Sequence, residues 1–100
     1  MNSKSYNSFF MNFANNARFK IIMALRNTNL SVTDICKETN QEQSRVSHHL
    51  KSMSQCNILN VKQQGKKRIY SLNKETVLPI LKLVEKHVKY YCRECDKREI

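Results

Sequence analysis

The sequence has little of what several large classes of protein need. Its 100 residues contain one glycine, one proline and no tryptophan. A glycine-rich phosphate loop or a dinucleotide fingerprint needs two or three glycines at fixed spacing, so both are excluded. A doubly wound sheet or a large barrel needs a longer chain than this one. What remains is a single small domain that spans residues 1–100.

The chain also lacks a long apolar segment. Its longest unbroken apolar run has five residues, from Ile21 to Leu25, whereas a transmembrane helix needs roughly 20. The first residues do not follow the charged-then-apolar plan of a signal peptide. We therefore expect a cytoplasmic protein whose four cysteines do not form a disulfide framework.

Acidic residues are scarce and unevenly placed. The chain carries 18 lysines and arginines against 8 aspartates and glutamates, which gives a formal charge of +10. Between Glu42 and Glu75 there are seven basic residues and no acidic one, whereas residues 75–100 are nearly neutral. Charge of one sign destabilises a compact chain by self-repulsion, so its concentration in one block indicates a polyanionic ligand.

The spacing of apolar residues predicts a mainly helical fold with one small β-hairpin. Ser31 begins a sequence typical of a capping box, and Asn40 suits a tight turn because asparagine tolerates the left-handed conformation. A last helix is expected from Asn73 or Thr76, with a narrow apolar seam that suits a helix–helix contact. The other helices are expected over residues 5–14, 17–26, 32–39 and 42–55.

The helix over residues 42–55 has one apolar side. Val46, Leu50 and Met53 are spaced by four and three residues, so they form a buried stripe. His49 is expected to pack against the scaffold, and Arg18 to tie helix ends together. The polar side is left with Arg45, Ser47, His48, Lys51 and Ser52.

A hairpin with a basic tip follows this helix. Residues 58–61 and 69–72 read as two short strands, and Gly65 stands at the bend between them. A short helix, a tight turn and a second amphipathic helix make a helix-turn-helix, and the basic hairpin makes a wing. The order of these elements predicts a winged helix-turn-helix.

The predicted elements match the chemistry of duplex DNA. The second motif helix, about residues 42–56, can enter the major groove, and the wing over residues 62–68 can reach the backbone or minor groove. We therefore predict sequence-specific binding of double-stranded DNA. The candidate contact residues are Gln43, Ser44, Arg45, Ser47, His48, Lys51, Lys62, Lys66, Lys67 and Arg68.

Four segments resemble the ArsR-type winged helix-turn-helix repressors. Residues 13–22 are similar to the opening of that family, residues 30–35 to its first motif helix, residues 43–51 to its recognition helix and residues 65–72 to its wing. The resemblance implies a homodimer joined through the first and last helices. It also implies that the dimer reads a pseudo-palindromic site, and that an inducer relieves repression.

The sequence does not decide which residues would sense the inducer of such a regulator. The family's arsenic- and lead-type site uses two cysteines where this chain has Ser31 and Thr33, and its zinc-type site is matched only around His87. No cofactor is required for the predicted DNA binding. His87, Cys92 and Cys95 form a candidate site for zinc or another thiophilic metal. The alternatives are packing of the two cysteines in the dimer seam, a redox-sensitive pair and intersubunit disulfides.

Two rival functions fit the sequence less well. A winged helix that binds RNA or another protein has the same fold and charge but no sequence-specific DNA site. A thiol oxidoreductase would use Cys92 and Cys95, but redox pairs of this spacing stand at the start of a helix that follows a strand. Here the pair ends a basic amphipathic helix, so we expect no enzymatic activity.

Overall fold

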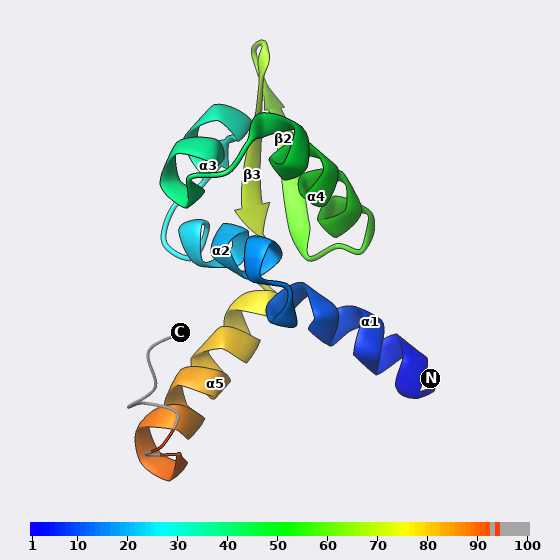
Figure 1. The fold of residues 1–100 in the computed structure, drawn as a ribbon, viewed down its shortest axis with the longest axis vertical. Coiled ribbons are helices and arrows are strands. Elements are labelled where there is room, and N and C mark those ends of the chain that lie inside the picture. Colours follow the sequence, from blue (N-terminus) through cyan, green and yellow to red (C-terminus); the bar gives the residue numbers. More distant parts are fainter. Residues whose placement is uncertain (93, 95–100) are drawn as a thin grey trace.

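The computed structural model describes residues 1–92 and 94. Figure 1 shows α3, α4 and the hairpin at one end of the molecule, with α1 and α5 diverging at the other. The fold of the described residues is mainly helical with a small antiparallel sheet, so the predicted fold class is confirmed. The elements are α1 (Ser3–Ala14), α2 (Asn16–Ala24), β1 (Leu30–Ser31), α3 (Val32–Thr39), α4 (Gln43–Gln55), β2 (Leu59–Gln64), β3 (Lys67–Leu72) and α5 (Val77–Tyr91).

Polar side chains stand at the starts of the helices, among them α3 and α5. The Ser31 hydroxyl accepts a hydrogen bond from the backbone N–H of Asp34 (3.3 Å), as the capping-box prediction requires. Thr76 is the N-cap of α5 but makes no side-chain bond there. Instead, the Asn73 side chain accepts from the backbone N–H groups of Glu75 (2.9 Å) and Thr76 (3.3 Å).

The core lies between α2, α3, α4 and the sheet. The predicted stripe of Val46, Leu50 and Met53 is 0% exposed. Burial of one such side chain contributes about 1.5–3 kcal/mol, so the stripe fixes which side of α4 faces the core. The other buried apolar residues are Ile21, Ile22, Leu25, Ile35, Ile58, Leu59, Tyr70, Leu72, Val77 and Leu81.

The sheet is larger than the sequence predicted. Its strands run in the order β1-β3-β2, and Leu30 of β1 pairs with Tyr70 of β3. The hairpin strands are longer than expected, because pairing continues to Gln64 and Lys67. Gly65 has φ +63° and is the first of two turn residues, as in a type II′ hairpin. β1 was not predicted, because two residues are too few for an alternating pattern to be recognised.

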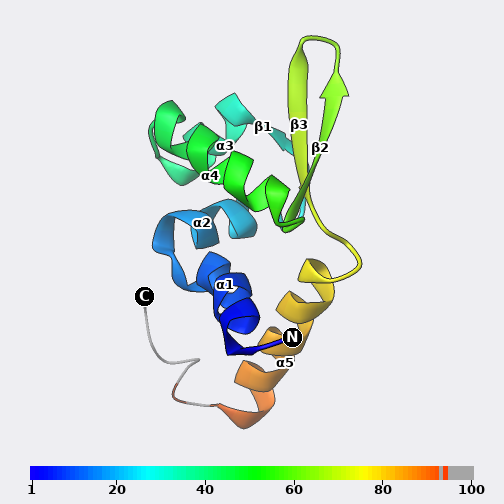
Figure 2. The same cartoon turned by 90° about the vertical axis from the view of Figure 1, so that its right-hand side faces the viewer.

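Helices α1 and α5 leave large apolar side chains exposed at the end opposite the hairpin (Figure 2). On α1, Phe10 is 53% exposed although its ring contacts Phe9 and Phe13. On α5 only the first turns are buried, and Leu83 is 65% and Tyr91 75% exposed. Among the described residues, no helix has both the length and the apolar character that crossing a membrane requires.

Two asparagines adopt the left-handed conformation. Asn40 ends α3 with φ 53° and ψ 50°, as predicted for the turn of the motif. Asn57 has φ 58° and follows α4 one residue beyond its C-cap, Cys56. A left-handed residue with a Cβ atom costs roughly 1–2 kcal/mol, and asparagine reduces that cost by local hydrogen bonding.

Substitution of Asn40 tests this turn. We expect Asn40→Ala to lower the free energy of unfolding by about 1 kcal/mol, and Asn40→Gly to leave it unchanged or raise it. Urea denaturation monitored by circular dichroism measures both. Asn29→Ala is the matched control, because Asn29 lies in an exposed turn without a positive φ. Equal losses in the alanine and glycine variants of Asn40 would contradict the assignment.

Candidate nucleic-acid interface

The polar side of α4 faces solvent, because the opposite side is buried in the core. The first turn of α4 contains no acidic residue, and the N-cap Glu42 makes no side-chain hydrogen bond. Free backbone N–H groups at a helix start favour an anion, which can be a phosphate. The exposed residues on this helix include every predicted contact of the segment: Gln43, Ser44, Arg45, Ser47, His48 and Lys51.

The hairpin of β2 and β3 stands out from the body of the protein beside α4 (Figure 2). Lys62 lies in β2, Lys66 in the two-residue turn, and Lys67 and Arg68 at the start of β3. All four side chains are exposed. Four of the seven cations of the basic block are therefore gathered on a projection next to the polar side of α4.

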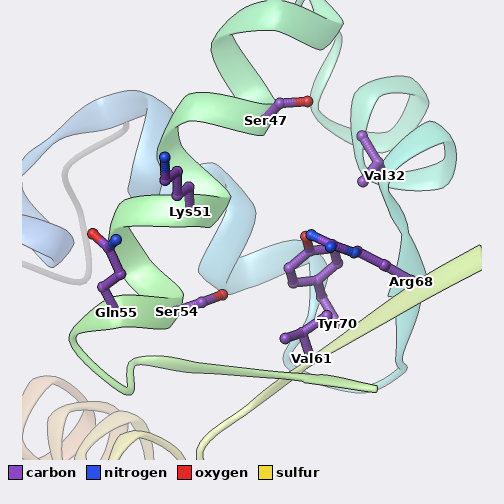
Figure 3. Close-up of a pocket in the computed structure, with 8 residues that line it drawn as sticks. All are labelled: Val32, Ser47, Lys51, Ser54, Gln55, Val61, Arg68 and Tyr70. Atoms are coloured by element: carbon purple, nitrogen blue, oxygen red, sulfur yellow. The ribbon is translucent and has the colours of Figure 1, made fainter. Parts of the chain in front are cut away.

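An open pocket of about 610 Å³ lies between α4 and β3. Figure 3 shows Ser47 and Lys51 on α4, with Arg68 extending from β3 beside Tyr70. The pocket thus combines two cationic side chains with hydroxyl groups. A second hollow of about 450 Å³ lies between the start of α3 and the wing. Its lining is Ser31, Val32, Thr33, Gln63, Lys66, Lys67 and Arg68.

The two hollows include only part of the predicted site. Ser54 lines the first pocket and was not predicted, although Ser47, Lys51 and Ser54 follow one helix side at spacings of four and three. The Ser54 hydroxyl is buried and has no hydrogen-bond partner among the described residues. The predicted residues that line neither hollow are Gln43, Ser44, Arg45, His48 and Lys62.

On the other side of α4 lies a hydrogen-bond network centred on Arg18 of α2. The Arg18 guanidinium donates from Nε to His49 Nδ1, from Nη1 to Asn12 Oδ1 and from Nη2 to Ser52 Oγ, each at 3.1 Å. The expected structural roles of Arg18 and His49 therefore agree with this geometry. Ser52, expected on the polar side of α4, is half-buried, and its hydroxyl accepts a hydrogen bond from Arg18.

Asn12 of α1 is the buried member of this network, and no pattern in the sequence indicates this role. Its side chain is 1% exposed. The amide nitrogen donates to the carbonyl oxygens of Ser8 (3.3 Å) and Phe9 (3.0 Å). With the bond from Arg18, both ends of the amide are satisfied, as a buried polar group requires.

His49 is held in its neutral form by its surroundings. Burial lowers the pKa of His49 below 6.5, and the nearby positive charges of Arg18, His48 and Arg45 lower it further. A histidine with a lowered pKa binds fewer protons when folded than when unfolded. Its contribution to stability is therefore present above pH 6.5 and is lost as the pH falls from there through the lowered pKa.

The structure leaves the predicted metal site untested as a set. His87 stacks on Tyr91, with ring centroids 5.7 Å apart. Cys92 is the C-cap of α5, and Cys95 lies outside the described residues. Within the described part of the chain, no three or more His, Cys, Asp or Glu residues are grouped to hold a metal ion. Metal binding at His87, Cys92 and Cys95 thus stays a prediction.

The fold and its basic face define a winged helix-turn-helix protein. A family model described as "Bacterial regulatory protein, arsR family" matches residues 15–61, which contain α2, the whole motif and the start of β2. This match confirms, over the residues that carry the motif, the resemblance to ArsR-type regulators read from the sequence.

Solved structures share this fold. The transcriptional regulator HlyU from Vibrio vulnificus is 26% identical, with a TM-score of 0.72 over 84% of this chain and 88% of that one. Rv0081 from Mycobacterium tuberculosis is 21% identical, with a TM-score of 0.82 over 94% and 95%. The homodimeric DNA-binding domain of Mb0332 from Mycobacterium bovis is 19% identical, with a TM-score of 0.72 over 88% and 81%. No curated protein matches the sequence.

Loss of the Arg18 network is expected to destabilise the fold. Arg18→Gln removes the donor to the buried Asn12 oxygen and should lower the free energy of unfolding by about 1–3 kcal/mol. Arg26→Gln is the matched control, because Arg26 forms an exposed ion pair with Glu85 (3.0 Å) and such pairs contribute about 0–1 kcal/mol. Chemical denaturation measures both variants. A larger loss in the Arg26 variant would contradict the role given to Arg18.

Proposed function

We propose that the chain is a homodimeric, sequence-specific DNA-binding repressor. The observation that carries this proposal is the exposed polar side of α4 beside the basic hairpin, at the end of the molecule away from α1 and α5 (Figure 1). Helix α4 enters the major groove, which has the width to admit a helix. The hairpin lies along the backbone or in the minor groove.

The residues of this surface divide into two roles. Arg45 and His48 project from the exposed side of α4 and contact base edges, with Gln43, Ser44 and Ser47 near the helix start. Lys51 of α4 and the wing cations neutralise phosphates and provide attraction that is independent of sequence. The wing cations are Lys62, Lys66, Lys67 and Arg68.

The second copy of the chain is placed against α1 and α5. Both helices expose large apolar side chains, which a soluble monomer rarely leaves in one region. The homodimeric state of the Mb0332 domain supports the same arrangement. Two copies then present their α4 helices to successive major grooves, with half-site centres about 34 Å apart. A pseudo-palindromic operator follows from that symmetry.

Control of the repressor through Cys92 and Cys95 is a separate hypothesis. Two cysteines at this spacing suit zinc or another thiophilic metal when reduced, and disulfide formation when oxidised. Metal analysis and thiol titration of protein purified without oxygen separate metal binding, disulfide formation and simple packing. DNA binding in the absence of metal is compatible with all three.

Salt dependence tests the DNA-binding surface. After selection of an operator from random duplexes, Lys66→Gln should weaken binding to operator and unrelated duplexes alike, and reduce the salt slope by about 1. Arg45→Ala should cost about 1–3 kcal/mol on the operator alone. Fluorescence anisotropy at several salt concentrations measures these effects.

Lys82→Gln on α5 is the control, since it removes the same charge away from the proposed surface. A Lys82 variant as impaired as the Lys66 variant would contradict the surface. Selection that returns no protected pseudo-palindrome would favour the alternative of a winged helix that binds RNA or protein without a sequence-specific DNA site.

The oligomeric state tests the dimer face. Leu83→Asp places a charge in the apolar surface of α5, and we expect sedimentation to show monomers and DNA affinity to fall at least tenfold. Val61→Asp is the control for oligomeric state, because Val61 is an exposed apolar residue of β2, outside α1 and α5. A dimeric Leu83 variant together with a monomeric Val61 variant would place the interface elsewhere.

A further inference from the structure

The Arg18 network connects the two ends of the molecule. Arg18 itself is half-buried on α2, and its three hydrogen bonds reach Asn12 on α1 and both His49 and Ser52 on α4. Helix α1 belongs to the proposed dimer face and α4 to the proposed DNA face. The network is therefore a direct polar connection between the element that sets dimer geometry and the element that reads DNA.

The chemistry of this connection depends on one proton. An arginine Nε–H can only donate, so His49 Nδ1 must offer a lone pair, and the neutral ring carries its proton on Nε2. A protonated His49 has a donor on both nitrogens and cannot accept from Arg18. The charged groups that act on His49 are Arg18 from α2 and His48 and Arg45 from its own helix. The contact from α1, Asn12, is neutral.

We propose that Arg18 is a positioning residue for DNA binding, and that its bond to neutral His49 makes the orientation of α4 relative to α1 sensitive to protonation. The proposal rests on the proposed function, because it takes α4 as the recognition helix. When His49 gains a proton, α4 keeps only the Ser52 bond to Arg18. In a dimer, the distance between the two α4 helices is then less well defined, so they fit two successive major grooves less well.

The direction of the pH effect distinguishes this proposal from simple electrostatics. A proton on His49 adds a positive charge to a DNA-binding helix, which by itself strengthens attraction to phosphate. Loss of the Arg18 bond has the opposite effect, because it releases the helix. His48 is a second histidine exposed on the same helix, so the test replaces it first.

The test compares two variants in the full chain. His48→Gln serves as the parent, and His48→Gln/His49→Asn replaces the titrating ring by an amide whose oxygen accepts from Arg18 at all pH values. We expect operator affinity of the parent to fall about fivefold between about pH 7.5 and 5.5 at constant salt, which is at the low end of typical couplings between sites. The second variant should show no such fall. An affinity that rises in the parent, or falls equally in both, overturns the proposal.

A second measurement does not involve DNA. Nitrogen NMR of the wild-type chain should show His49 neutral with its proton on Nε2 at about pH 7.5, and the Arg18 Nε–H signal should shift as His49 titrates. Arg18→Gln should raise the His49 midpoint toward 6.5. An Arg18 signal that stays constant through the His49 titration overturns the proposal, even where Arg18→Gln fails to fold. If the chain binds no duplex at any pH, the proposed function is overturned instead. The NMR titration still tests whether the Arg18–His49 hydrogen bond depends on the protonation of His49.

Discussion

The burial of one side of α4 is the constraint on which the rest of the structure depends. Val46, Leu50 and Met53 have no exposed surface, and successive residues of a helix turn by about 100°, so the opposite side must face solvent. Rotation of α4 to hide its polar side would expose three apolar side chains, at about 1.5–3 kcal/mol each. The presentation of Arg45 and His48 is thus determined by the core, before any ligand is bound.

A second constraint separates the molecule into two ends. Cationic side chains keep their charge in water or beside an anion, whereas an apolar seam would desolvate them at a large free-energy cost. In this chain most cations of the basic block and most of the exposed apolar side chains lie at different ends of the molecule. Residues 43–74 carry seven basic residues and no acidic one, while α1 and α5 expose Phe10, Leu83 and other apolar groups. The uneven distribution of acidic residues along the sequence produces this separation in the folded chain.

The elements that the sequence predicted well are those with a local cause. The stripe of α4 follows from helical periodicity, Ser31 begins α3 through a bond three residues away, and Asn40 ends it through its own backbone conformation. The features that were missed have distant causes. Strand β1 exists because Leu30 pairs with Tyr70, which lies far along the chain. Asn12 reads as one more polar residue of an amphipathic helix until the position of Arg18 is known.

The connection between α1 and α4 runs through the polar side chain of Arg18 on α2, and its polar character has a physical consequence. Apolar contacts are non-directional, so two helices joined only by them can slide or rotate with a small change in buried area. The three bonds of Arg18 impose fixed directions, and a buried amide such as Asn12 is stable only when both its ends are paired. Displacement of α1 from α2 would leave the buried Asn12 Oδ1 without its donor, Arg18. A network of this kind therefore restrains the angle between α1, which we propose joins two copies, and α4, which we propose reads DNA; a leucine in place of Arg18 would not do so.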